Sequence, residues 1–419
     1  MTPSRETGTN ATAASTHEAN GVLLQFGSMM VRSGSTATRA RVWIKLIAKK
    51  IGFDAISVSV SLDCITVSGS HSGGPVTEMR NIGPPGINAY RIAELERLAK
   101  SLVSGASPGE IAEKLAGIEA TPPLYSSIPI AVAVGAASGG FAFLSGAAMP
   151  EMAAAAIGGG GGQWLRLWLS RRQFNHYGGA AVCAIVASGV YVLAAALASF
   201  LGFGFSHYAA GFIASVLFLV PGVPLIAGLF DLLQYQTVAG MSRTAYGAMI
   251  LLTVGLGLSI VVAVAGVDVS RQPPFELSYP SRVLLRAVAS FVAGGAFAML
   301  FNSPARAVLA AGLLALVAND VRLFLNDMGM MLAPATFLAA LTIGIVALLL
   351  EQRFDISLMA TTVSPIIIMM PGLYAFETIV LFNHGEMSKA LQAGASCGFV
   401  IGALAMGLAT SRFFQQRMT

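Results

Sequence analysis

The stretch LVPGVPLIAGLF, Leu219–Phe230, places Pro221, Gly222 and Pro224 in the middle of an apolar run over residues 208–233. Proline has no amide hydrogen and its ring collides with the preceding helical turn, while glycine adds conformational freedom. The stretch therefore predicts a membrane helix that is interrupted near its centre.

A second interruption is expected near the other end of the chain, where IIIMMPGLY, Ile366–Tyr374, contains Pro371 and Gly372. In lipid, backbone groups that such a break frees need a partner from protein, water or a ligand. Breaks at matching positions in two halves of a membrane protein point to a transporter's binding site. The alternative, in which both prolines only kink helices that pack against their neighbours, stays open.

The composition assigns most of the chain to a membrane. Of 419 residues, 55% are hydrophobic and 11% are charged, and the mean hydropathy is +0.73. An average globular domain is about 25% charged. The net charge of +5 is spread along the chain, without the dense basic block that would indicate a nucleic-acid partner. Three well-separated cysteines give no disulfide framework or metal motif, so no metal or cofactor is expected.

The first 124 residues can form a small soluble α+β domain. Residues 1–20, rich in Thr, Ala, Ser and Gly, are expected to be a disordered tail, and 21–124 the folded domain. Ser107, Pro108 and Glu110 form a capping-box pattern that predicts a helix start. The other expected elements are a helical segment at 21–51, strands at 55–60, 65–67 and 76–82, and an amphipathic helix at 88–103.

One pattern in this domain suggests catalysis, the GSHSG sequence at residues 69–73. A nucleophile elbow needs serine at the centre of such a motif, and His71 is there instead. These residues are interpreted as a polar loop, and the chain is not predicted to be an enzyme.

The rest of the chain is expected to be mainly α-helical, with about ten membrane spans of about 20 residues each. In each set of five spans, the second is short and ends in a mixed segment that contains Arg166 or Arg322. The glycine run at 158–162 lacks the Gly-Lys-Ser/Thr of a phosphate loop and is interpreted as a close helix contact. The expected spans are 126–149, 151–170, 178–201, 208–233, 244–266, 283–303, 305–324, 332–350, 358–382 and 390–411.

Matching patterns in the two sets of five spans indicate an internal duplication of about 150 residues. Three pairs of segments match in the same order: GFAFL (140–144) with AFAML (296–300), LRLWL (165–169) with VRLFL (321–325), and VPG (220–222) with MPG (370–372). Because five is an odd number, the second set enters the membrane from the opposite side, which predicts inverted repeats.

Loop charges give the expected orientation, because Arg and Lys accumulate in cytoplasmic loops. With the front domain in the cytoplasm, the inside receives Arg171, Arg172, Arg243, Arg306, Arg353, Arg412 and Arg417, and the outside receives Arg271, Arg282, Arg322 and Lys389. Both termini are therefore expected in the cytoplasm. The expected segments are a first repeat at 125–266, an extracytoplasmic loop at 267–282, a second repeat at 283–412 and a tail at 413–419.

Ionisable residues near the spans are functional candidates, because charge in lipid is costly. Asp231 follows the first break and Glu377 follows the second, and both are candidate gate or coupling residues. An interfacial position is the open alternative for these two. Asp320, Asn326 and Asp327 are interpreted as interfacial.

The combined pattern resembles the threonine/serine exporter (ThrE) family, whose two parts occur in some bacteria as separate YjjP-like and YjjB-like proteins. The resemblance covers nearly the whole chain from about Gly21, and the order of short motifs carries it. The front motifs are Ser33-Gly34, Thr38-Arg39, Gly52, Asn88, Ser107–Glu110, VPGVP at 220–224, Asp231 and Arg243. The back motifs are FAMLFNSP at 297–304, Arg306, TFLAA at 336–340 and MPG at 370–372.

The resemblance implies a multi-pass inner-membrane exporter of small hydrophilic metabolites, driven by the proton gradient, with threonine and serine as expected substrates. A dicarboxylate such as succinate is the alternative substrate, because the split relatives are linked to dicarboxylate export. Family members often carry glutamates where this chain has Thr36 and Arg41 or Val42.

Together these observations predict alternating access around a midplane site between the two broken spans. Half-helix ends and freed carbonyls would bind the carboxylate and ammonium of an amino acid. The rival interpretations are a membrane-bound hydrolase and a non-transporting sensor or scaffold, and small-residue faces leave room for a homo-oligomer. The expected substrate contacts are Pro221, Gly222, Pro224, Pro371, Gly372, Tyr374 and Thr336, with Asp231 or Glu377 as proton carrier and Arg243 as gate partner.

Overall fold

The structure is a computed structural model, which describes residues 6–70, 75–203, 208–267, 277–354, 356 and 358–418. The chain divides into two compact units. Unit 1 comprises Met1–Pro123 and Ala227–Thr244, and unit 2 comprises Leu124–Ile226 and Ala245–Thr419. The sequence places residues 227–244 in the first membrane repeat, whereas their contacts lie with the front domain.

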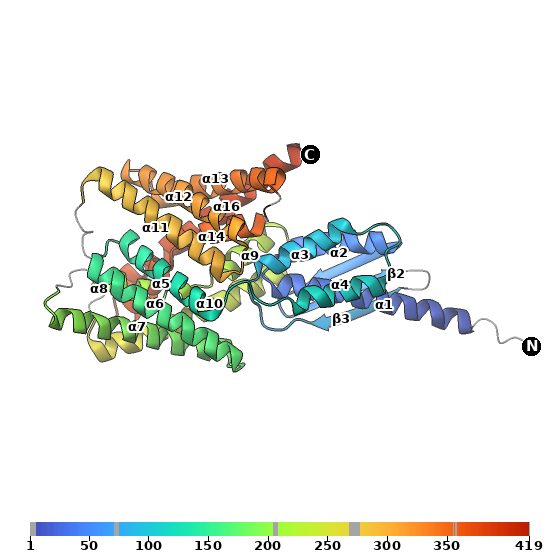
Figure 1. Ribbon diagram of the computed structural model, residues 1–419, viewed down its shortest axis with the longest axis horizontal. Helices are drawn as coiled ribbons and strands as arrows, with labels where there is room; N and C mark the ends of the chain where they lie inside the picture. Colours follow the sequence, from blue (N-terminus) through green and yellow to red (C-terminus); the bar gives the residue numbers. More distant parts are fainter. Residues whose placement is uncertain are drawn as a thin grey trace, which may run out of the picture. The chain divides into compact units, whose positions relative to one another are not determined.

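In unit 1, four helices pack with a three-stranded antiparallel sheet of order β1-β2-β3 (Figure 1). Serine and apolar residues alternate in β1 and β2, so that Val58, Val60, Ile65 and Val67 are buried on one face. The elements are α1 (Glu6–Arg32), α2 (Ala37–Ile51), β1 (Ala55–Val60), β2 (Cys64–Ser70), β3 (Val76–Asn81), α3 (Ala89–Ser101) and α4 (Pro108–Ala120).

Helix α1 forms the centre of this core and contacts both β2 and β3. Its side chains Leu23, Phe26 and Met30 are fully buried. Gly27 allows the close packing, because a Cβ there would lie 2.7 Å from Ile44 Cδ1 and 2.9 Å from Cδ1 of Ile65.

Two expectations for this unit need correction. The composition predicts a disordered tail for residues 1–20, yet α1 begins at Glu6 and Thr16 and Ala19 are buried. A helix that is anchored by its packed turns extends readily into neighbouring residues. Helix α4 begins at Pro108 as predicted, but the Ser107 side chain makes no capping hydrogen bond, and proline at the first position marks the start without it. His71 lies outside the described residues.

The apolar sequence after residue 124 forms a second group of helices. Helix α9 begins in unit 2 and ends in unit 1, and α10 begins in unit 1 and ends in unit 2. The elements are α5 (Ser127–Leu144), α6 (Met149–Arg171), α7 (His176–Phe200), α8 (Tyr208–Ala214), η1 (Leu217–Leu219), α9 (Gly222–Leu233), α10 (Thr237–Ala265), α11 (Tyr279–Leu300), α12 (Ala305–Asp327), α13 (Leu332–Phe354), α14 (Leu358–Ile368), α15 (Gly372–Asn383) and α16 (Met387–Met418).

Among the described residues, seven helices are long and apolar enough to cross a membrane, and up to nine spans result if each bent helix pair counts as one. The bent pairs are Ala209–Leu219 with Gly222–Leu233 and Leu358–Ile368 with Gly372–Asn383. The sequence predicts about ten spans. The difference lies in α6, whose glycine run, Gln163 and Arg166 lower its hydropathy.

The helices of the two halves follow one another in the same order. Helices α6 and α12 begin at residues 149 and 305 and end at residues 171 and 327, so both of their ends are 156 positions apart. Helices α9 and α15 begin at 222 and 372, and α10 and α16 at 237 and 387, so these pairs are 150 positions apart.

The turns between helices also correspond. In three pairs of turns, the second residue after the helix adopts the left-handed conformation, and the amide of the next residue bonds to the carbonyl five positions before it. The two halves therefore share one backbone pattern. The paired left-handed residues are Gly146 and Asn302, Gln173 and Gly329, and Tyr235 and Gly385.

Equivalent residues of the two halves meet where α5 contacts α11 in unit 2. The rings of Phe141 and Phe297, 156 positions apart, pack edge to face with centroids separated by 5.8 Å. Contact between equivalent residues indicates an approximate two-fold axis at this place.

The glycine run of α6 is a site of close helix packing. A Cβ on Gly158 would lie 2.6 Å from the carbonyl oxygen of Ala187, and one on Gly160 would lie 3.0 Å from that of Ala131. Gly161 faces open space. The interpretation of this run as a close helix contact is confirmed.

Candidate functional site

The first break lies between α8 and α9. A single 3-10 turn, Leu217–Leu219, precedes it, and α9 begins at Gly222. Because Pro221 has no amide hydrogen, it cannot bond to the carbonyl of Phe218 three residues earlier. The amide of Gly222 bonds instead to the carbonyl of Val220, at 2.8 Å. The helical segments on either side meet at 64°.

The second break lies between α14 and α15, which meet at 44°. Helix α14 ends at Ile368, and Pro371 is the residue that precedes α15, with φ −80° and ψ 47°. Both Pro371 and Gly372 are buried, and no side chain caps the first amide groups of α15. The end of one helical segment and the start of the next therefore come together inside the protein.

The two breaks touch each other through their glycines. A Cβ on Gly222 would lie 3.0 Å from Cγ1 of Ile367 and 3.5 Å from Cγ of Met370. The residues that approach Gly222 are thus those just before the second break. A side chain at this glycine would separate the two broken spans.

Gly372, the glycine of the second break, in turn packs against residues just before the first break. A Cβ on Gly372 would lie 2.7 Å from Cδ2 of Leu217 and 2.9 Å from Cγ2 of Val220. These two residues stand 150 positions before Ile367 and Met370, as Gly222 stands before Gly372. The breaks are therefore related by the same kind of two-fold contact as the phenylalanine pair.

An arginine from a neighbouring helix donates to the backbone at each break. Arg166 on α6 donates from Nη1 to the carbonyl of Phe218 at 3.3 Å. Arg322 on α12 donates from Nη1 to the carbonyl of Met369, also at 3.3 Å. The arginines are equivalent, 156 positions apart, and a cation is favourable beside the carboxyl end of a helical segment.

In the sequence, these arginines stand out only as parts of a repeated segment, and no role is predicted for them. The signal that could have identified them is a cation at the same place in both copies of an apolar helix. What the sequence cannot give is their targets, a carbonyl three residues before Pro221 and a carbonyl two residues before Pro371.

The predicted side-chain contacts lie on three helices. Pro224 is half-buried in the first turn of α9, where proline is tolerated. Tyr374 is half-buried in the first turn of α15, within electrostatic range of Arg322. Thr336 is fully buried on α13, where its hydroxyl donates to the carbonyl of Leu332 at 2.7 Å.

The two candidate proton carriers have different surroundings. Glu377 is buried on α15 in unit 2, close in sequence to the second break. Asp231 is fully buried near the end of α9 in unit 1. They are not equivalent in the duplication, because Leu381 stands 150 positions after Asp231.

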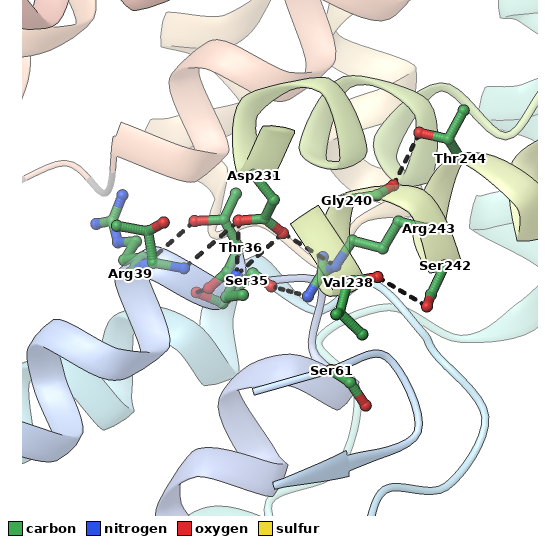
Figure 2. A network of polar contacts seen from close by, with 12 residues as sticks. Ser35, Thr36, Arg39, Ser61, Asp231, Val238, Gly240, Ser242, Arg243 and Thr244 are labelled. Carbon is green, nitrogen blue, oxygen red and sulfur yellow. Dashed lines mark hydrogen bonds and ion pairs between the residues drawn. The ribbon is translucent and has the colours of Figure 1, made fainter. Parts of the chain in front are cut away.

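In unit 1, Asp231 holds the start of α2. Its Oδ1 accepts hydrogen bonds from the amides of Ala37 at 3.0 Å and Thr38 at 3.4 Å. Nε of Arg243 lies 3.3 Å from Oδ2, and Nη2 of Arg243 donates to the carbonyl of Ser35 at 2.7 Å. Figure 2 shows the carboxylate and the guanidinium meeting at the connection between α1 and α2. A carboxylate at a helix N-terminus is stabilised by the helix dipole.

The start of α2 has further support from its own side chains. Thr36 is the N-cap residue and accepts the amide of Arg39 at 3.3 Å. The Arg39 guanidinium forms a bidentate ion pair with Glu96 on α3, through Nε to Oε1 and through Nη2 to Oε2, the latter at 2.9 Å. Among the described residues, no group of three or more His, Cys, Asp and Glu side chains could hold a metal ion.

Comparison with known proteins identifies the family. The family model ThrE, described as "Putative threonine/serine exporter", matches residues 21–265, and a second model, described as "Threonine/Serine exporter, ThrE", matches residues 286–414. The chain belongs to the ThrE family. With its apolar helices, this member of the ThrE family is a multi-pass protein of the inner membrane.

Two ThrE relatives are similar along most of the chain. A protein of Corynebacterium glutamicum named "Threonine/serine exporter" is 25% identical, over 90% of this chain and 80% of the relative. A protein of Mycobacterium tuberculosis named "Probable threonine/serine exporter" is 24% identical, over 92% of this chain and 73% of the relative. A protein of Haemophilus influenzae named "Uncharacterized protein" is 32% identical, over 27% of this chain and 41% of the relative. No solved structure matches the chain.

Proposed function

We propose that this chain is a secondary active exporter of small hydrophilic amino acids, with threonine and serine as substrates, across the bacterial inner membrane. The names of its relatives support the substrates. The observation that carries the proposal is the reciprocal contact of the two breaks through Gly222 and Gly372. Where interrupted helices meet inside a membrane protein, their free backbone N–H and C=O groups can bind a ligand in place of water.

The transport mechanism that we propose is alternating access between two inverted repeats. Five spans in each repeat would turn the second repeat upside down, with both termini in the cytoplasm. The reciprocal contacts at the phenylalanine pair and at the breaks support a symmetry axis within unit 2. Rocking one repeat against the other around this axis would open the site to one side at a time.

The substrate site in this mechanism is the backbone of the two breaks. Pro221, Gly222 and Pro224 form one side, Pro371 and Gly372 the other, and Tyr374 provides a side chain at the start of α15. Half-helix N-termini attract the carboxylate of the substrate, and exposed carbonyls attract its ammonium group. Thr336 would contact the substrate only if its hydroxyl gave up its hydrogen bond to the Leu332 carbonyl and donated to the substrate instead.

For the coupling to the proton gradient we propose Glu377 as the proton carrier, because it is buried on the helix that follows the second break. Asp231 is ion-paired and accepts two backbone amides, which favours the charged carboxylate. We therefore propose that Asp231 and Arg243 act as a gate anchor that ties α9 to the soluble domain, rather than as a proton path.

A dicarboxylate such as succinate is the second candidate substrate. The observation that favours it is the presence of two arginines, Arg166 and Arg322, one at each break. Each guanidinium could take one carboxylate of a two-carboxylate ligand.

The test is efflux of labelled L-threonine, L-serine and succinate from liposomes that contain the purified full-length chain. Chain-free liposomes from the same lipid are the control. We expect threonine and serine to leave faster than from the control, and faster still when a proton gradient is imposed. Succinate efflux alone would favour the second candidate, and no flux of any compound under any gradient would favour a sensor or scaffold.

A further inference from the structure

Arg166 and Arg322 carry charges for which the described part of the chain supplies no carboxylate. Each guanidinium has five N–H donors but makes one hydrogen bond to the described residues, to a backbone carbonyl. The Nε atom of Arg322 is buried without a partner. A charged group in an apolar helix bundle is costly unless an anion compensates it.

One turn before each arginine stands a buried amide with an unused acceptor. Gln163 on α6 is 1% exposed and Asn319 on α12 is 0% exposed. Within the described residues, Oε1 of Gln163 and Oδ1 of Asn319 have no hydrogen-bond partner. An unpaired buried carbonyl oxygen costs about 1–3 kcal/mol, so the same defect at both equivalent positions requires an explanation.

The orientation of the Asn319 amide is fixed by its neighbour. Its Nδ2 donates to Oγ of Ser290 at 2.8 Å, and the Ser290 hydroxyl itself donates to the carbonyl of Arg286. Because that hydroxyl hydrogen is already used, Ser290 can only accept from Asn319. The oxygen of Asn319 is therefore the atom that remains free to accept.

The amide and the arginine of each helix lie on one face, because residues three apart are neighbours on a helix surface. The arginine of each pair reaches a carbonyl two or three residues before the proline of a break, so both pairs belong to the break region of unit 2. Arg166 is exposed and Arg322 is half-buried, whereas Gln163 and Asn319 are buried, so the proposed binding at the amides requires the repeats to move apart.

We propose that Gln163 with Arg166, and Asn319 with Arg322, form two recognition pairs for an α-amino acid. In each pair the guanidinium binds the carboxylate and the amide oxygen binds the ammonium group. The inference rests on the proposed export function and adds side chains to a site that otherwise consists of backbone. With one pair in each half, the substrate would pass from one pair to the other as the repeats alternate.

A purely structural role is the competing explanation for the arginines, since a cation can cap the freed carbonyls of a helix end. A cap would leave the four other N–H donors of each guanidinium and both amide oxygens without a function. The two explanations differ in one measurable property. Only recognition pairs make the affinity depend on which charged group the ligand carries.

The test is equilibrium binding of three labelled ligands to the purified full-length chain. L-Threonine has both charged groups, L-threoninol lacks the carboxylate, and 3-hydroxybutyrate lacks the ammonium group. For the wild type we expect threonine to bind about 10–100 times more tightly than either analogue, the range of one hydrogen bond to a charged group.

The double variant Arg166→Gln/Arg322→Gln should bind threonine and threoninol equally, with threonine weakened about 10–100-fold. The matched control is Arg171→Gln. Arg171 is an exposed arginine on the same helix as Arg166, and it donates to the hydroxyl of Ser127 on α5. The control variant should retain the threonine preference of the wild type. A folded double variant with threonine affinity within about two-fold of the wild type overturns the inference.

The double variant Gln163→Leu/Asn319→Leu keeps the test decisive if the arginine variant does not fold. Removing unpaired buried acceptors should not prevent folding. We expect this variant to lose the preference for threonine over 3-hydroxybutyrate, and an unchanged preference overturns the inference. Wild-type chain that binds none of the three ligands would instead contradict the proposed function itself.

Discussion

Gly222 and Gly372 occupy the same position in the two broken spans, and each packs against the same two positions of the opposite span. An added Cβ would come closer to its neighbour at Gly372, with 2.7 Å to Leu217, than at Gly222, with 3.0 Å to Ile367. We therefore expect Gly372→Ala to slow threonine efflux and to destabilise the protein by about 1–3 kcal/mol, the usual cost of overpacking. Gly222→Ala should have a smaller effect of the same sign.

The contact can be tested by compensation, because the atom that Gly372→Ala meets is the end of the Leu217 side chain. Adding Leu217→Ala should restore part of the efflux rate. The control is Gly402→Ala on α16, where a Cβ meets nothing within 4 Å. That change should leave efflux unaltered and should raise the midpoint of thermal unfolding slightly, since alanine is the better helix residue. Equal effects at positions 372 and 402 would contradict the assigned contact.

The ion pair of Asp231 with Arg243 predicts a strong effect of its loss on the stability of unit 1. Asp231→Asn leaves the buried Arg243 guanidinium without its carboxylate, which should cost about 3–5 kcal/mol. We expect faster tryptic cleavage near Arg39 and a lower midpoint of thermal unfolding in detergent. Asp231→Leu/Arg243→Met removes both charges and should recover much of the loss.

A partly exposed ion pair provides the comparison for this experiment. Arg286 and Asp327 in unit 2 pair with 21% and 28% of their side chains exposed. Because solvent screens such a pair, Asp327→Asn should cost at most about 1 kcal/mol. If the two asparagine variants lower the unfolding midpoint equally, Asp231 is not an anchor.

The proposed inverted arrangement of the repeats predicts opposite sides of the membrane for equivalent turns. Arg172 and Met328 each follow the second helix of a repeat, and both are exposed. In a variant without Cys64, Cys183 and Cys397, Arg172→Cys should react with an impermeant thiol reagent only from the cytoplasm, and Met328→Cys only from outside. Labelling of both positions from one side would rule out inverted repeats.

Much of the fold can be predicted from the periodicity of apolar residues and from the positions of proline and glycine. The breaks at Pro221 and Pro371 follow from the chemistry of proline, which acts locally and can be read from sequence. The expected helix at residues 151–170 is present as α6, although its hydropathy does not qualify it as a span. The tail at 1–20 fails as a prediction because packing downstream, at Leu23 and Phe26, determines whether a polar helix forms.

The site is less predictable, because it depends on contacts between distant segments. The sequence singles out Asp231 by its place after a break, but cannot show that it binds the amide of Ala37, 194 positions earlier. Gln163 and Asn319 differ in residue type, and only the structure shows that both amides are buried and that each has an oxygen without a partner among the described residues. Thr336 carries a family motif, yet its hydroxyl bonds within its own helix.

Efflux of labelled threonine from liposomes with Pro221→Ala/Pro371→Ala is the most direct test of transport at the paired breaks. Alanine restores an amide hydrogen at both positions, which lets the backbone bond to carbonyls such as that of Phe218 and close the breaks. We expect efflux at least about tenfold slower than wild type, equivalent to about 1.4 kcal/mol or more. A folded double variant that transports threonine at the wild-type rate would contradict the account.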